Sequence, residues 1–162
     1  MDKISNFVEL KKSNKIWAIG SIHSNLKSFD SIKKFLLDNF EENDKLVFLG
    51  NVIGLGNNSK ETLSSVIDLR FNLMSKFKLK PESIVFLRGA QEYEAKIFSG
   101  DPIKISEVVR DLFRKSSQAE QSYSERQMFQ VAIERLAREV AAVDKTDYFQ
   151  STEKIEQILS NK

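Results

Sequence analysis

The chain has 162 residues, of which 41% are hydrophobic and 30% are charged, so it is long enough for one domain to bury a hydrophobic core. Its 25 Lys and Arg residues and 23 Asp and Glu residues leave a formal charge of +2, too small for the positive field that nonspecific nucleic-acid binding requires. The lack of Cys excludes disulfides, thiolate metal sites and Cys nucleophiles, and residues 1–15 contain no apolar run that suits a signal peptide or a membrane span. We therefore expect a cytoplasmic protein that binds neither nucleic acid nor membranes.

Three short apolar runs predict strands at residues 16–19, 46–49 and 84–87. Each run is hydrophobic at every position, as in strands that are covered on both faces. The segments between the runs, residues 28–40 and 58–77, repeat apolar residues at helical spacing. The order β-α-β-α-β with right-handed crossovers predicts an α/β fold with a parallel sheet.

The apolar stripes of the two predicted helices define the faces that we expect to be buried. They consist of Phe29, Ile32, Leu36 and Phe40 in the first helix, and of Leu63, Ile67, Phe71 and Met74 in the second. Asn58 and Glu61 have the spacing of a capping box at the start of the second helix.

After residue 100 the pattern is helical only. Asp101-Pro102 is a helix start signal, and Ser124 with Gln127 has the spacing of a second capping box. Two apolar stripes follow, made of Phe129, Ile133, Leu136, Val140 and Val143, and of Ile155, Ile158 and Leu159. We expect an α/β region at residues 1–100 and a helical segment at residues 101–162 that packs on it. A homo-oligomer formed through the C-terminal helices is the alternative use of these stripes.

Each predicted strand ends at a loop that contains glycine and polar residues. The loops are residues 20–25 (GSIHSN), 50–56 (GNVIGLG) and 88–92 (RGAQE). Because the carboxyl ends of neighbouring parallel strands lie at one edge of a sheet, the three loops are expected to converge. Taken one at a time, each loop is better explained as a tight turn into the following helix.

Taken in order, the three loops resemble the motifs of the calcineurin-like metallophosphoesterases, in the branch of serine/threonine phosphatases and diadenosine tetraphosphate hydrolases. That family has Gly-Asp-x-His-Gly-Asn, Gly-Asp-x-x-Gly-Arg-Gly and Arg-Gly-Asn-His-Glu. The resemblance covers residues 15–97 and implies the parallel-sheet half of that fold. The helical segment would then replace the family's second half.

The resemblance also implies a site without its metal chemistry. Ser21 and Asn51 stand where the family has metal-binding Asp residues, Ala90 replaces a metal-binding Asn, and Gln91 replaces the catalytic His. His23 is retained, but it is the only His in the chain. Neutral side chains cannot offset the charge of two divalent ions. We therefore expect no bound metal, no cofactor and no catalytic residue.

These substitutions lead to three hypotheses on function. The first is a catalytically inactive phosphoesterase-like protein, not an enzyme, that acts by binding another protein. The second is a metal-free binder of phosphate or a nucleotide. The third is an active metal-dependent phosphoesterase with a rearranged site. The candidate ligand-binding residues are Ser21, His23, Asn25, Asn51, Arg88 and Gln91.

Overall fold

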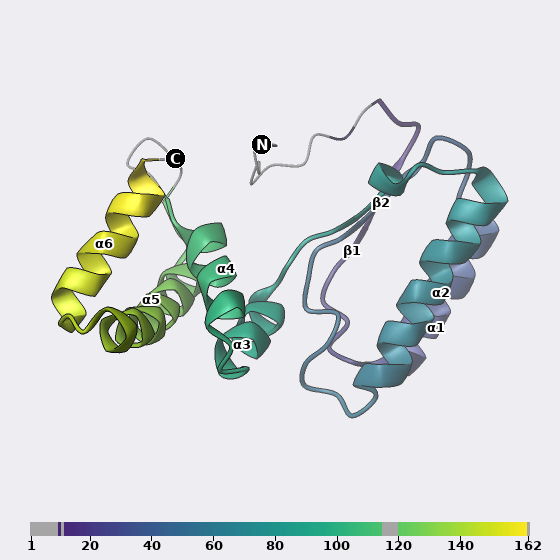
Figure 1. Cartoon of the computed structure of the whole chain (residues 1–162). Coiled ribbons are helices and arrows are strands. Elements are labelled where there is room, and N and C mark those ends of the chain that lie inside the picture. Colours follow the sequence, from purple (N-terminus) through teal and green to yellow (C-terminus); the bar gives the residue numbers. More distant parts are fainter. Residues whose placement is uncertain (1–9, 11, 115–119, 162) are drawn as a thin grey trace. The chain divides into compact units, whose positions relative to one another are not determined.

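The computed structural model describes residue 10, residues 12–114 and residues 120–161 (Figure 1). The chain divides into two compact units, Met1–Glu92 and Tyr93–Lys162, and the division falls within helix α3 (Ala90–Phe98). The packing of residues 101–162 on the preceding region, expected from the sequence, stays a prediction.

The first unit is built on a small parallel sheet. Strands β1 (Ile16–Ile19), β2 (Lys45–Phe48) and β3 (Ile84–Phe86) lie in the order β1-β2-β3. The register pairs Trp17 with Leu46 and Leu46 with Ile84. The expected mixed α/β class with a parallel sheet is confirmed, and most of the structure is helical. That the sheet is half of a metallophosphoesterase fold is not confirmed.

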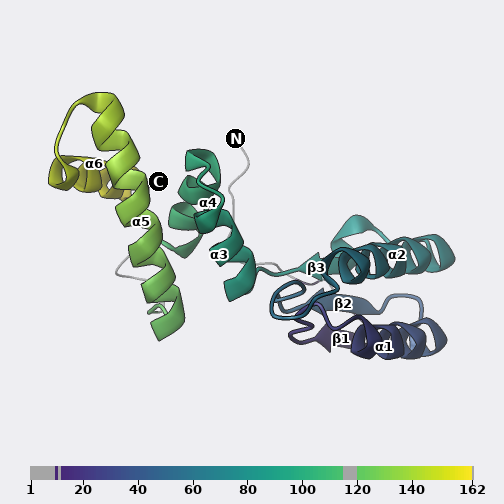
Figure 2. The ribbon, with the colours of Figure 1, turned by 90° about the horizontal axis from the view of Figure 1, so that it is seen from below.

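Helices α1 (Leu26–Asn39) and α2 (Ser59–Phe77) lie side by side on one face of this sheet (Figures 1 and 2). A short 3-10 helix, η1 (Pro81–Ser83), leads from α2 into β3. Leu46 and Phe48 of β2 point into the layer between sheet and helices, where they are fully buried. Phe29 and Leu36 of α1 and Phe40, which follows its last turn, are buried as expected, whereas Ile32 is 38% exposed.

The predicted buried face of α2 is wrong at three of its four positions, whereas Met74 packs against the core of this unit. Leu63, Ile67 and Phe71 are 46%, 44% and 65% exposed. The buried face instead consists of Thr62, Ser65, Val66, Leu69 and Leu73. The polar residues on this face contact α1. The hydroxyl of Ser65 donates a hydrogen bond to the Asp30 carboxylate of α1 at 2.9 Å. The predicted capping box is also wrong, since the side chain of Asn58 makes no capping hydrogen bond.

The second unit contains the end of α3 and helices α4 (Pro102–Leu112), α5 (Tyr123–Asp144) and α6 (Tyr148–Ser160). Its apolar core consists of Ile97, Ile105, Val108, Val109, Leu112, Ala132, Ile133, Ala137 and Ile155. Phe129, Leu136 and Val140, which belong to the predicted stripe of α5, pack against this core. An ion pair between Lys96 and Glu107 joins α3 to α4, and Arg135 of α5 donates to the Ile97 carbonyl at 3.1 Å.

The helix starts in this unit agree only in part with those predicted from the sequence. Asp101 caps α4 as predicted, because its carboxylate accepts a hydrogen bond from the Ile103 N–H at 3.0 Å. The capping box of α5 lies two residues earlier than predicted and consists of Ser122 and Glu125. The hydrogen bond from the Ser122 backbone holds the pKa of Glu125 below its ordinary value. Within the described residues no helix is long and apolar enough to cross a membrane.

Candidate functional site

The three strand-end loops of the first unit lie against one another, as the parallel strand order predicts. The backbone N–H groups of Ile22 and His23 donate to the Asn51 carbonyl at 3.0 and 2.9 Å. The N–H of Ser24 donates to the Val52 carbonyl at 3.0 Å. The loop after β1 is therefore held to the loop after β2 by backbone hydrogen bonds.

The Asn51 side chain links the loops after all three strands. Its amide nitrogen donates to the Ser21 hydroxyl at 3.2 Å, and its carbonyl oxygen accepts from the Gln91 N–H at 3.0 Å. Three of the six candidate residues are thus brought together. Both ends of the Asn51 amide are used in bonds between the loops.

Glu92 organises the same loops, a role that its sequence motif does not predict. Its carboxylate accepts hydrogen bonds from the N–H groups of Asn51, Val52 and Gly89, each at 2.8 Å. Charge-assisted bonds of this kind are stronger than those between neutral groups. As the only acid in the three loop motifs, Glu92 was visible in the sequence, but its partners are backbone atoms that no sequence motif identifies.

Two glycines are required because the loops after β2 and β3 approach closely. A Cβ atom on Gly50 would lie 2.2 Å from the Gly89 nitrogen, and one on Gly89 would lie 2.3 Å from the Asn51 side-chain oxygen. Gly50 also has a φ of +93°, which side chains rarely adopt. These glycines therefore serve the packing of the two loops.

Gly89→Ala is expected to lower the free energy of unfolding by about 2 kcal/mol, because the added methyl group forces the loops apart. Gly20→Ala is the matched control, since nothing lies within 4 Å of a Cβ atom there. Chemical denaturation of both variants measures the effect. Equal stabilities of the two would contradict the close approach of the loops.

Of the other three candidate residues, His23 lies beside the same cluster, because a Cβ atom on Gly54 would lie 2.9 Å from His23 Nδ1 and 3.0 Å from Gln91 Cγ. His23 Nδ1 is buried without a hydrogen-bond partner among the described residues. Asn25 caps α1, because its side-chain oxygen accepts from the Ser28 N–H at 3.1 Å. Arg88 follows β3 and is exposed. Ligand binding by the six candidate residues is not tested by these contacts and stays a prediction.

A pocket of about 200 Å³ lies between the end of β1 and the start of α1. It is lined by Ile19, Gly20, Ser21, Ile22, Asn25, Ser28, Phe29 and Ile32. The lining contains no charged side chain. Among the described residues, no group of three or more His, Cys, Asp or Glu side chains could hold a metal ion. The polar atoms of this region mainly hold loops and a helix start in place.

The second unit has a groove of about 320 Å³ between α4, α5 and α6. It is lined by Ser106, Val109, Arg110, Leu136, Ile155, Ile158 and Leu159. Ile158 is 55% exposed, so the groove presents apolar surface to the solvent. Arg110 is the only charged residue in the lining, and its guanidinium contacts the Asp111 carboxylate at 2.9 Å.

The comparison with protein families identifies the chain. The family model described as CarD, C-terminal domain, matches residues 73–156, which is more than half of the chain. The protein therefore belongs to the CarD C-terminal domain family. This family is associated with transcription, and its domains interact with protein partners. No curated protein and no solved structure gives a significant match to the chain.

This finding corrects the family expected from the three loops. The assignment to the calcineurin-like metallophosphoesterases is wrong, and with it the function of a decayed phosphoesterase. The matched segment begins at Leu73 and includes the third loop motif. The contacts supply a physical reason for the error: Gly50, Gly89, Asn25 and Glu92 all have structural roles in loop packing and helix capping. Such residues recur wherever parallel strands turn into helices.

Proposed function

We propose that this chain is a transcription-associated interaction module that binds a protein partner through its helical unit. The match of residues 73–156 to the CarD C-terminal domain family is the observation that carries the proposal. The matched segment includes the whole of α4 and α5 and most of α6. The family's association with transcription makes RNA polymerase the partner to test first.

The groove between α4, α5 and α6 is the surface that supports this proposal. Grooves between helices accept apolar side chains or an amphipathic helix of a partner. Val109, Leu136 and Ile158 provide the apolar lining, and Arg110 provides a charged group at which a partner's carboxylate could bind. The groove therefore combines an apolar contact area with one polar anchor.

The charge of the helical unit favours a protein partner over nucleic acid. Residues 93–162 contain 11 Lys and Arg residues and 12 Asp and Glu residues. Binding to a phosphate backbone depends on an excess of positive charge, which this unit lacks. The prediction that the chain does not bind nucleic acid depends on this charge alone and stays a prediction. A homo-oligomer formed through the C-terminal helices also stays a prediction. A cytoplasmic location is proposed because the proposed role requires access to the transcription machinery.

Ile158→Lys is expected to weaken binding to RNA polymerase at least tenfold without changing the melting temperature. The side chain is 55% exposed and lines the groove, so the charge would oppose an apolar partner and not the fold. Ile103→Lys is the matched control, because Ile103 is 72% exposed on α4 and does not line the groove. Biolayer interferometry with immobilised wild-type and variant chains measures the affinity.

The proposal fails if purified RNA polymerase does not bind the wild-type chain. If Ile103→Lys and Ile158→Lys weaken binding equally, the groove between α4, α5 and α6 is not the binding surface. Light scattering on the wild-type chain tests the alternative, since a stable dimer that Ile158→Lys converts to a monomer would assign the groove to self-association.

A further inference from the structure

Strand β3 forms an open edge of the sheet in the first unit. Within the described residues the sheet has the order β1-β2-β3, and β3 has a neighbour on one side only. The N–H of Leu87 donates to the Phe48 carbonyl at 2.8 Å and therefore points toward β2. Because backbone groups alternate along a strand, the N–H and C=O of Phe86 point to the open side. Such an edge can accept a further strand.

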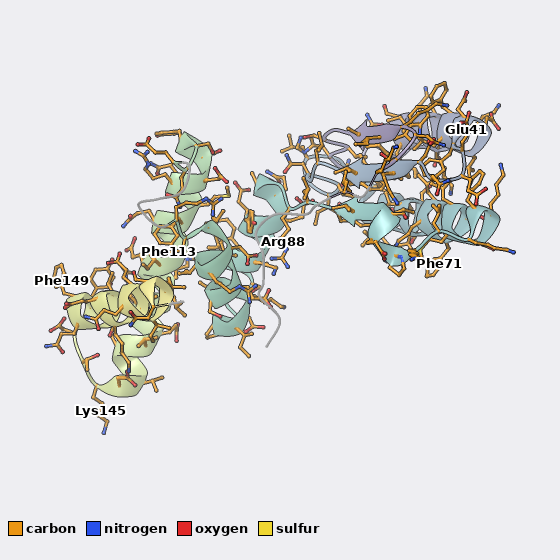
Figure 3. All side chains as sticks on the ribbon, turned by 90° about the horizontal axis from the view of Figure 1, so that it is seen from above. Glu41, Phe71, Arg88, Phe113, Lys145 and Phe149 are labelled. Atoms are coloured by element: carbon orange, nitrogen blue, oxygen red, sulfur yellow. The ribbon has the colours of Figure 1, made fainter. Side chains whose placement is uncertain are left out.

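An exposed apolar flank of α2 borders this edge. Leu63, Ile67 and Phe71 follow one another at intervals of four residues and are 46%, 44% and 65% exposed. The opposite flank of α2 contacts α1 through Ser65, and Figure 3 shows Phe71 on the side of α2 away from α1. Arg70 connects the flank to β3, because its guanidinium carbon lies 6.0 Å from the centre of the Phe86 ring.

The charges on this side of α2 are positive. Lys60 and Arg70 share the flank of Leu63 and Ile67 by helical spacing, and the exposed Lys78 and Lys80 follow α2 before β3. The acids of α2 lie elsewhere: Asp68 is 4.0 Å from Lys33 of α1, and Glu61 shares the Asp68 side by helical spacing. Glu82 in η1 is an acid that precedes β3.

Arg70 also has an unused donor. Its Nε is buried and has no hydrogen-bond partner among the described residues. Buried donors are nearly always paired in folded proteins, so the unpaired Arg70 Nε next to the open edge is an exception that an acceptor on a bound segment would remove.

We propose that the edge of β3 and the flank of α2 bind an extended segment of another protein, which adds to the sheet as a fourth strand. The segment has apolar side chains at alternate positions, which contact Leu63, Ile67 and Phe71, and acidic residues that pair with the basic rim. Main-chain hydrogen bonds to Phe86 provide affinity, and the α2 flank provides specificity. This surface belongs to the first unit and does not depend on the proposed function of the helical unit.

Charge decides between this occupant and two others. In a second copy paired antiparallel along β3, the α2 flank that carries Lys60 and Arg70 would lie beside the same flank of the other chain, and like charges close together are destabilising. Nucleic-acid binding needs a large excess of positive charge. Residues 1–92 contain 14 Lys and Arg residues and 11 Asp and Glu residues, so their excess of positive charge is small. An open strand edge offers backbone hydrogen bonds that an extended peptide can use, and a peptide's alternate side chains can contact a mixed aliphatic and aromatic flank.

Selection of a random 16-residue peptide library on the full chain tests the proposal. We expect enrichment of proline-free peptides with alternating apolar residues and Asp or Glu near their ends. The Ile67→Ser/Phe71→Ser double variant should bind the best peptide at least tenfold more weakly, and Lys78→Glu/Lys80→Glu should weaken it at least threefold. Leu55→Ser is the control, because Leu55 is 82% exposed in a loop and should leave binding unchanged.

Hydrogen exchange identifies the edge directly, since the amide of Phe86 should become protected when the best peptide binds. The proposal is overturned if no such peptides are enriched, if their binding survives the α2 substitutions, or if Phe86 gains no protection. Binding of an oligothymidine probe that is lost in Lys78→Glu/Lys80→Glu, without peptide binding, would assign the surface to nucleic acid. A concentration-dependent dimer that Ile67→Ser/Phe71→Ser abolishes would assign it to a second copy.

Discussion

Ile133→Asp is expected to lower the free energy of unfolding by about 4 kcal/mol, because it removes a buried apolar side chain and places a carboxylate in its position. Ile133 is 2% exposed and belongs to the apolar core of the helical unit, which also contains Val109 of α4 and Ile155 of α6. The residues that make up this core are apolar, so the new carboxylate must take up a proton or the helices must separate.

Val131→Asp is the matched control for this substitution. Val131 lies on the same helix and is 41% exposed, so the same change should alter stability by less than about 0.5 kcal/mol. Thermal unfolding combined with light scattering measures both variants. A fully folded Ile133→Asp chain that has only changed from a dimer to a monomer would show that α5 is an assembly helix and not part of an internal core.

Glu92→Ala is expected to lower the free energy of unfolding by about 3 kcal/mol, since hydrogen bonds to charged groups are each worth about 1.5 to 3 kcal/mol and solvent access reduces their sum. The substitution leaves the N–H groups of Asn51, Val52 and Gly89 without their acceptor. Glu92→Gln keeps one acceptor oxygen and should fall between the wild type and Glu92→Ala.

Hydrogen exchange makes this prediction specific to the loops. In Glu92→Ala the amides of Asn51, Val52 and Gly89 should exchange faster than in the wild type, before global unfolding occurs. Glu82→Ala is the control, because Glu82 is exposed in η1. Unchanged exchange at the three amides would mean that the carboxylate does not hold the loops together.

The errors on α2 show which information a pattern of apolar residues lacks. Leu63, Ile67 and Phe71 have the spacing of a buried face, yet the neighbouring row of Val66, Leu69 and Leu73 is buried. Both rows are apolar at helical spacing, so the pattern predicts a helix without defining its rotation about its axis. Contacts with α1 and the sheet choose the rotation.

The error of family assignment has a related cause. The loop motifs after β1, β2 and β3 suggested a decayed catalytic site, because glycines and polar residues at strand ends occur both in active sites and in ordinary turns. In the structure Gly89 is needed for close approach to Asn51, and Glu92 accepts from three N–H groups. The family match then assigns the chain to the CarD C-terminal domain family.

The sequence by itself determined the three strands, the two helices between them, the parallel sheet and the all-helical end of the chain, because these depend on local apolar spacing, glycines and helix caps such as Asp101. It did not predict α3. Only the tertiary structure decided which row of α2 is buried, which atoms Glu92 binds and which side of β3 is open. Those features arise from contacts between residues far apart in the chain, where the partners of a side chain are backbone groups whose positions exist only after folding.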